Sequence, residues 1–239
     1  MLILAMDTSG PSVSVALWRD GRLLAEVSSQ TGQPHSTTLL PLAASLLQSC
    51  GLDAGAPDAY ACAVGPGSYT GIRIGVSTIK AMAYAAHKPA IGISTLAAMA
   101  WPYAGCPDLI ICPMIDARNN RLFAGAWLNG QEIIPAANCL DSDFVEKVRE
   151  FSVNHLDIEP VSGLLLVGYH PEAFFESCGK PVIPGTGQAP STASLPRAAA
   201  VAEMAEIRLL GGESGEPQQL MPQYLSASQA ERRRADHHV

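Results

Sequence analysis

Apolar and polar positions alternate at the start of the chain in a way that predicts strands. Leu2 to Met6 is a continuous apolar run, and Ser12 to Trp18 alternates polar and apolar residues as a half-buried strand does. Asp20-Gly21 is a strong signal for a tight hairpin turn, so Leu23 to Ser28 is expected to return antiparallel to the strand before it. The chain is therefore predicted to open with three antiparallel strands.

A helical pattern follows these strands. Thr37 or Thr38 is expected to begin a helix that carries Pro41 in its first turn and ends at Gly51. Its apolar stripe is broad and consists of Leu39, Leu42, Ala43, Leu46 and Cys50, with Leu40, Ala44 and Leu47 beside them. Two interpretations stay open: the helix is enclosed within its own domain, or it turns one side to a sheet and another to a partner.

A glycine-rich segment, Gly65 to Gly75, has the sequence GPGSYTGIRIG. It joins a predicted buried strand, Ala59 to Val64, to a predicted helix, Ile72 to Ala86. Gly65 and Gly67 permit positive φ and close approach of the backbone, while Ser68 or Thr70 can cap the helix.

Two interpretations of the glycine segment also stay open. It is an anion or partner site at a helix N-terminus, or it is a tight turn between strand and helix. The segment matches neither the P-loop pattern nor the dinucleotide-binding pattern, so its spacing alone favours the turn.

The order of predicted elements in this part of the chain is β-β-β-α-β-α-β-α, completed by a strand at Pro89 to Ser94 and a short helix at Thr95 to Trp101. A hairpin followed by parallel crossovers is the layout of the ribonuclease-H-like lobe of actin, sugar kinases and Hsp70. In that fold the turn after the first strand carries an acidic residue, and Asp7, followed by Thr8 and Ser9, has this place. There Asp7 could approach a phosphate or a metal-bound water.

The rest of the chain predicts a second, reduced lobe of the same kind. We expect a first lobe over residues 1–104 and a second over 105–216, with the segment from about 217 to 239 as a candidate to pack back on the first. The predicted fold class is thus a two-lobed α/β, actin-like (ASKHA) fold with mixed sheets flanked by helices. The expected second-lobe elements are strands at Leu109 to Ile115, Leu122 to Trp127 and Gln131 to Pro135, a helix at Asp141 to Phe151, a strand at Leu164 to Tyr169, and helices at Pro171 to Cys178 and Arg197 to Leu210.

Composition narrows the classes of function. The formal net charge is −7, which argues against a free-standing nucleic-acid binder with a basic surface. Only 15% of residues are charged and 48% are apolar, so exposed apolar surface and hence a protein interface are expected, although an alanine-rich composition is a rival explanation. Six scattered cysteines without a C-x-x-C pair indicate a reducing compartment, and no apolar stretch reaches membrane-spanning length, so we expect a cytoplasmic protein without a membrane partner.

Catalytic and metal-binding patterns are missing from the sequence. His35 is followed four residues later by Leu39, so the pair of imidazoles that H-x-x-x-H would place on one helix face is broken. Ser68 does not lie in the G-x-S-x-G pattern of esterases. The basic run Arg232 to Arg234 is either a solvated tail or a contact for RNA or an acidic partner. We predict no metal site and no catalytic residues.

Several motifs together resemble the TsaB (YeaZ) family. They are Asp7-Thr8-Ser9, His35-Ser36 with Leu39-Leu40-Pro41, the long string Gly65 to Gly75, and Ile115-Asp116-Ala117-Arg118. Pro222-Gln223-Tyr224-Leu225 resembles the family's P-x-Y-L segment, although Ser226 stands where a basic residue is common. The resemblance covers most of the first lobe and extends into the second.

The resemblance implies a non-catalytic paralogue of TsaD. TsaD transfers threonylcarbamoyl from threonylcarbamoyl-adenylate to N6 of the adenine beside the anticodon in ANN-decoding tRNAs, and it binds its metal partly through an H-x-x-x-H pair. TsaB-like proteins pair with TsaD, are joined by the ATPase TsaE, and often self-associate through the same surface. The chain is then expected to have no cofactor of its own, with ATP or ADP and a metal ion in the partner subunits or at the junction, and to meet tRNA only through the complex.

The resemblance and the helical stripes together suggest where a partner binds. Gly71 and Gly75 of the second helix, with Thr78, Met82 and Ala85, are small or slender residues that let another helix approach, unless they only seat the helix on its own sheet. The predicted partner interface consists of Leu39, Leu42, Leu46, Tyr69, Thr70, Arg73, Ile74, Ser77, Thr78 and Met82. A vestigial nucleotide or anion site is predicted at Asp7, Thr8, Ser9, Gly65, Gly67 and Ser68.

Two other functions compete with the hypothesis that the chain is a non-catalytic scaffold subunit, which binds and activates a TsaD-like enzyme. An independent ATPase or phosphotransferase of the actin-like class would use Asp7 as an acid beside a metal and Gly65 to Gly67 as a phosphate loop. It would also need a second phosphate loop, for which Gly163, Gly168 and Gly185-Thr186-Gly187 are the candidates. A metalloprotease is disfavoured because the second histidine is absent.

Overall fold

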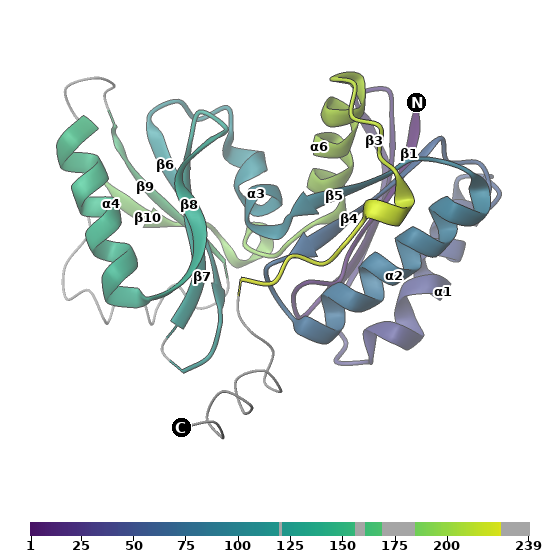
Figure 1. Cartoon of the computed structure of the whole chain (residues 1–239), viewed down its shortest axis with the longest axis horizontal. Helices are drawn as coiled ribbons and strands as arrows, with labels where there is room; N and C mark the ends of the chain where they lie inside the picture. Colours follow the sequence, from purple (N-terminus) through teal and green to yellow (C-terminus); the bar gives the residue numbers. More distant parts are fainter. Residues whose placement is uncertain (120, 156–160, 169–184, 226–239) are drawn as a thin grey trace.

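The computed structural model describes residues 1–119, 121–155, 161–168 and 185–225, and it contains two five-stranded sheets side by side (Figure 1). The first part of the chain forms β1 (Leu2–Asp7), β2 (Val13–Arg19), β3 (Arg22–Ser29), α1 (His35–Ser49), β4 (Ala59–Gly65), α2 (Tyr69–Ala86), β5 (Ala90–Ser94), α3 (Thr95–Ala100) and the 3-10 turn η1 (Trp101–Tyr103). The remainder forms β6 (Leu109–Asp116), β7 (Arg121–Leu128), β8 (Gln131–Leu140), α4 (Asp141–His155), β9 (Gly163–Gly168), β10 (Thr186–Gln188), η2 (Ser191–Ala193), α6 (Ala198–Leu210) and η3 (Pro217–Gln219).

The first sheet confirms the predicted ribonuclease-H-like order. Its strands lie in the order β3-β2-β1-β4-β5, with β1, β2 and β3 antiparallel and β4 and β5 parallel to β1. Asp20 and Gly21 form the tight hairpin turn with positive φ values of 48° and 76°. Parallel neighbours need crossover connections. α1 crosses over between β3 and β4, and α2 between β4 and β5, as the periodicity of the sequence predicts.

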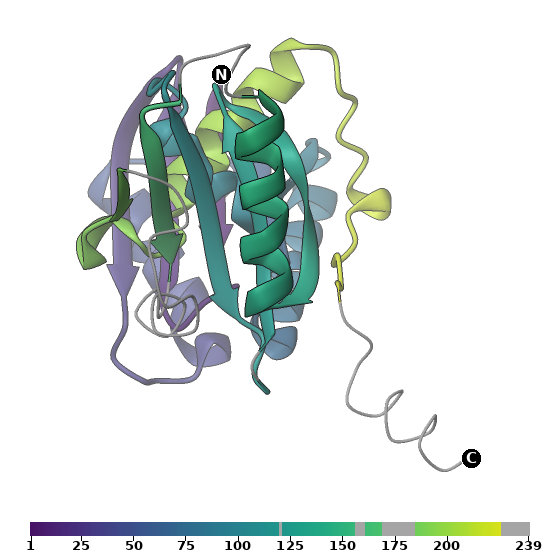
Figure 2. The same cartoon turned by 90° about the vertical axis from the view of Figure 1, so that its left-hand side faces the viewer.

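The second sheet repeats this topology. Its order is β10-β9-β6-β7-β8, with β6, β7 and β8 antiparallel and β9 and β10 parallel to β6. Asp116 ends β6 as Asp7 ends β1, and each carboxylate accepts the backbone N–H two residues on, from Arg118 and Ser9 respectively. The two-lobed α/β fold class is therefore confirmed. Figure 2 shows α4 lying across the second sheet, where Phe144 and Val148 join its core.

Both faces of the first sheet are covered by helices. Alternate side chains of β1 point to opposite faces, so Leu4 packs with α1 and α2, whereas Ile3 and Ala5 pack against α6. The N-terminus of α6 is held to the sheet by Glu26, which accepts the N–H of Ala199 at 3.0 Å and pairs with Arg197. The prediction placed residues up to 216 in the second lobe, but α6 belongs by its contacts to the first sheet. The remaining division of the chain into lobes stays a prediction.

Residues 213–225, here called the C-terminal strap, run back along the first sheet to α2 (yellow in Figures 1 and 2). Gly215 O accepts the N–H of Ala90 at 2.7 Å, and Gln223 donates its N–H to Val64 O at 2.7 Å. Leu220 is buried in the core beneath α1 and α2. The described part of the segment that was a candidate to pack back on the first lobe thus contacts β4, β5 and α2.

Some element boundaries differ from the predicted ones. α1 begins at His35 rather than at Thr37 or Thr38, which places Pro41 inside the helix instead of in its first turn. α2 begins at Tyr69, three residues before the expected start, because Ser68 caps it by accepting the N–H of Gly71 at 3.2 Å. β8 continues to Leu140 through its pairing with β7. The predicted helix at 171–178 and the basic run at 232–234 lie outside the described residues.

Candidate functional site

The glycine segment crosses the turn that follows β1. Ser68 donates its backbone N–H to Ser9 O at 2.7 Å, and Thr8 Oγ1 donates to Gly71 O at 2.7 Å. The side chains of Thr8 and Ser9 are buried at this crossing. The turn after β1 and the start of α2 are thus bonded directly to each other, which fixes the position of α2 over the sheet.

Gly65 and Gly67 both face backbone oxygens of the chain itself. Their φ values of 116° and 153° favour glycine, and a Cβ on Gly67 would lie 2.4 Å from Ser9 O. A Cβ on Gly65 would lie 2.4 Å from Gln223 O of the C-terminal strap. Carbonyl oxygens carry partial negative charge and repel an anion at these positions. The geometry accordingly supports the interpretation as a tight structural turn, and the vestigial nucleotide or anion site stays a prediction without support from this loop.

Gly71 and Gly75 turn toward the sheet and not toward a partner. A Cβ on Gly71 would lie 2.0 Å from Thr8 O, and one on Gly75 would lie 2.5 Å from Thr8 Oγ1. Both glycines are buried. The hypothesis that they let a partner helix approach is therefore wrong for these two positions: they allow α2 to sit closely on the turn after β1.

Asp7 is fully buried beside this crossing. Its Oδ1 accepts the N–H and the hydroxyl of Ser9 at 2.8 and 2.7 Å, while Oδ2 has no hydrogen-bond partner among the described residues. Burial raises the pKa of Asp7 to about 6, against the smaller lowering effects of the Ser9 hydrogen bonds and of His35. Within the described ranges, no three His, Cys, Asp or Glu side chains gather as a metal site would require.

α1 and α2 lie next to each other in Figure 1, and the exposed residues on their outward sides carry very little charge. We call this surface the α1–α2 face. Its exposed residues are Ser36, Thr37, Leu40, Pro41, Ala44, Ser45 and Gln48 of α1, and Tyr69, Thr70, Arg73, Ser77, Ala81, Tyr84 and Ala85 of α2. Arg73 is the charged residue of this set, and neither helix contains Asp or Glu.

The structure separates the residues that the sequence grouped as a partner interface. Leu39 and Leu46 are 1% and 7% exposed and belong to the chain's own core, so they are removed from the predicted interface. The exposed members are Tyr69, Thr70, Arg73 and Ser77, and the half-buried ones are Leu42, Ile74, Thr78 and Met82. Periodicity alone could not divide them, because both sides of each helix carry apolar residues.

Among the exposed residues of the face that the predicted interface did not include, two have large apolar or aromatic side chains. Leu40 and Tyr84 are 53% and 62% exposed. The sequence places Leu40 beside the main apolar stripe of α1, and this position is the signal that could have indicated its exposure. Tyr84 follows Ser77 and Ala81 at helical spacing, which could have marked the outward side of α2.

An aromatic cluster borders the α1–α2 face at the start of α2. The rings of Tyr69 and Tyr224 are stacked with their centroids 4.8 Å apart, and the guanidinium of Arg73 lies 4.5 Å from the Tyr69 centroid. Arg73 Nε donates to Tyr224 Oη at 3.1 Å. Tyr224 belongs to the C-terminal strap, so this contact joins the strap to the face.

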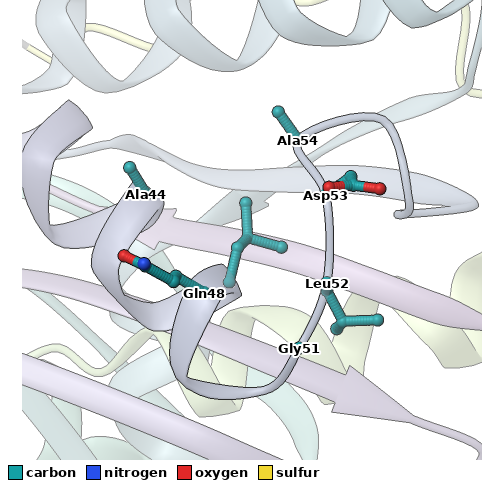
Figure 3. Close-up of a pocket in the computed structure, with 7 residues that line it drawn as sticks. Ala44, Gln48, Gly51, Leu52, Asp53 and Ala54 are labelled. Carbon is teal, nitrogen blue, oxygen red and sulfur yellow. The ribbon is translucent and has the colours of Figure 1, made fainter.

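A shallow open hollow of about 350 Å³ lies at the other end of the face, where α1 ends (Figure 3). Ala44 and Gln48 of α1 form one side, and Leu52, Asp53 and Ala54 of the following turn form the other. Its single charged lining residue is Asp53. The hollow extends the α1–α2 face and has no cluster of polar groups of the kind that binds a small ligand.

Comparisons with known proteins place these features in a family. A family model for TsaD, described as tRNA N6-adenosine threonylcarbamoyltransferase, matches residues 25–152, a segment that includes both α1 and α2. The TsaB protein of Bacillus subtilis is 33% identical over 154 residues, which cover 63% of this chain and 67% of that protein. The chain belongs to the TsaB (YeaZ) family.

Further relatives agree with this membership. The TsaB protein of Escherichia coli is 36% identical over 126 residues, which cover 52% of this chain and 53% of that protein. The structure of YeaZ from Pseudomonas aeruginosa matches with a TM-score of 0.71 at 26% identity, and the match covers 94% of this chain and 99% of that chain. The sequence matches thus span about half to two thirds of the curated relatives, while the structural match spans nearly the whole.

No helix in the described part of the chain combines the length and the apolar character that crossing a bilayer requires.

Proposed function

We propose that the chain is a non-catalytic subunit of the complex that makes threonylcarbamoyladenosine in tRNA, and that it acts by binding a TsaD-type catalytic subunit. Its curated relatives are named as tRNA threonylcarbamoyladenosine biosynthesis proteins, which supports a role in that pathway. The observation that carries the proposal is the α1–α2 face. A wide exposed surface with a single charged residue is typical of a protein interface.

The family match supports a TsaD-type subunit as the occupant of the face. The TsaD model matches the segment that contains α1 and α2, so a TsaD-type subunit has corresponding helices. Two related pairs of helices can pack against each other as a four-helix interface with a pseudo-two-fold axis. We propose that this pairing positions the catalytic subunit, with tRNA and a TsaE-type ATPase bound by the assembled complex and any nucleotide or metal held by the partners.

An independent ATPase or phosphotransferase is the alternative. Its phosphate loop would be Gly65 to Gly67, where backbone oxygens of Ser9 and Gln223 fill the space beside the glycines. Among the second-lobe candidates, Gly163 and Gly185 pack closely on each other's backbone and Gly168 faces Met114 O, while the space beside Gly187 is open. These contacts favour the proposal of a binding subunit.

A charge placed on the face tests the proposal. Ala44 is exposed on α1, so Ala44→Glu should leave folding intact and bury an unpaired carboxylate in the complex. We expect its affinity for the TsaD-type subunit of the same genome, measured by titration calorimetry, to fall at least about 100-fold. The matched control is Leu210→Glu on α6, 77% exposed on the opposite side of the first sheet. Equal affinities for Ala44→Glu, Leu210→Glu and the unchanged chain would contradict the proposal.

A further inference from the structure

Arg73 is placed as a preorganised cation on a face that has no acid to pair with it. The guanidinium rests over the Tyr69 ring, and its Nε is held by Tyr224 Oη. The ion pairs of the described residues engage Arg149, Arg197, Arg208 and the amino terminus, and none engages Arg73. Its terminal nitrogens are thus available to a group from outside this part of the chain.

The C-terminal strap fixes Arg73 in this position. Lys80 of α2 donates to the backbone oxygens of Gln218 and Leu220 at 2.9 and 3.3 Å, and Leu220 is buried in the core. These contacts hold the strap against α2 and bring Tyr224 onto Tyr69. An arginine whose side chain is already ordered loses less entropy on binding than a free one, and Tyr and Arg are the residue types that dominate binding energy at interfaces.

A second copy of the chain offers Arg73 no carboxylate from its own α1, α2 or the end of its strap. In a symmetric dimer each subunit presents the same patch. Residues 35–49 and 69–86, which form the two helices, and residues 217–225, the part of the strap after Glu216, contain no Asp or Glu. Self-association that packs these residues of one copy on the same residues of the other would therefore bury two arginines without a carboxylate, which is costly.

RNA is also a poor match for this surface. A phosphate backbone is bound by several cations that act together. Arg73 stands alone on the α1–α2 face, since Lys80 is engaged by the strap, and the chain carries a net charge of −7.

We infer that Arg73, held by Tyr69 and Tyr224, receives a carboxylate of the TsaD-type subunit and thereby selects that subunit over a second copy of the chain. This inference rests on the proposed function and adds the residue that gives the interface its specificity. Arginine forms two parallel hydrogen bonds with a carboxylate, so the contact sets both charge and geometry. The strap acts as a positioning element, because Tyr224 orients the guanidinium.

The test compares Arg73→Met and Arg73→Lys with the unchanged full-length chain and with Arg22→Met, a control at an exposed arginine of β3. Calorimetry measures affinity for the TsaD-type subunit at low and high salt, and sedimentation equilibrium measures self-association. For Arg73→Met we expect about tenfold or more weaker binding to the subunit, a reduced salt dependence, and self-association that is unchanged or stronger. Arg73→Lys should lose part of the affinity, because lysine cannot form the same fork.

Several outcomes would overturn the inference. Arg73→Met could bind the subunit within about twofold of the unchanged chain, or it could weaken self-association as much as it weakens subunit binding. Loss of tRNA binding at unchanged subunit affinity would assign Arg73 to RNA instead. Failure of the unchanged chain to bind the subunit would contradict the proposed function itself, so failure of the proposed function can be told apart from failure of the inference about Arg73. Unaltered thermal unfolding of both variants confirms that their folds are intact.

Discussion

Among single residues, Asp7 is buried, and among the described residues only one of its two carboxylate oxygens has hydrogen-bond partners. Its folded-state pKa lies near 6, above the ordinary value of 3.8, so the folded protein disfavours the charged carboxylate. The contribution of Asp7 to the free energy of unfolding is fully present below the ordinary pKa and is lost as the pH rises through about 6. Asp7 is therefore a residue whose charge weakens the fold near neutral pH.

The variant Asp7→Asn tests this assignment, because asparagine stays neutral at every pH. Between pH 4 and 7 the free energy of unfolding of the unchanged chain should fall relative to that of Asp7→Asn by about 2.4 kcal/mol, most of the roughly 3 kcal/mol that a shift from 3.8 to about 6 is worth over the whole titration. Urea denaturation at a series of pH values measures the difference. Asp108→Asn, at an exposed aspartate, is the matched control. A constant difference between Asp7→Asn and the unchanged chain across this range would show that the carboxylate is not desolvated.

Residue types alone could predict only part of the site. The string around Gly65 and Gly67 indicated a close backbone approach, and the structure supplies its causes, Ser9 O and Gln223 O. The second of these comes from the far end of the chain, which no local pattern can indicate. Leu39 and Leu46 could not be assigned to the core from a stripe that is apolar on both sides.

Among the elements, the strands and helices of the first sheet were predictable because each has its own periodicity and turn signals. The position of α6 was not. Its alanine-rich sequence does not indicate which sheet it covers, and its contacts with Glu26 join Arg197 and Ala199 to a residue far away along the chain. The path of the C-terminal strap likewise involves backbone hydrogen bonds to β4 and β5, which leave no pattern in the sequence.

The attachment of the strap to α2 is testable through Lys80. Lys80→Met removes two hydrogen bonds to strap oxygens while keeping an apolar stem of similar length. We expect faster proteolytic cleavage within residues 213–225 and faster hydrogen exchange there, at nearly unchanged global stability, because a locally released segment opens without unfolding the core. Lys147→Met on α4 is the control. Cleavage of the strap at the same rate in both variants would contradict its attachment through Lys80.

At the scale of the whole molecule, the two sheets repeat one topology. The proposed function lies on the α1–α2 face, the outward side of the two helices that cover one face of the first sheet. Tight packing of the turn after β1 on α2 and of the strap beside it gives a rigid surface. A rigid face loses little entropy on association, so it suits a subunit whose role is to hold another in place. The closed glycine loop holds α2 in place, and the nearly uncharged α1–α2 face is the surface proposed to bind the partner.

The most direct test of that role is the mass of the species formed with the TsaD-type subunit of the same genome. The unchanged chain of 25.1 kDa, the catalytic subunit and an equimolar mixture are run on a size-exclusion column with light scattering. The account predicts a new peak with the summed mass of one copy of each, formed at the expense of any dimer of the chain. Two peaks at the masses of the separate proteins, with nucleotide and a TsaE-type ATPase also present, would contradict it.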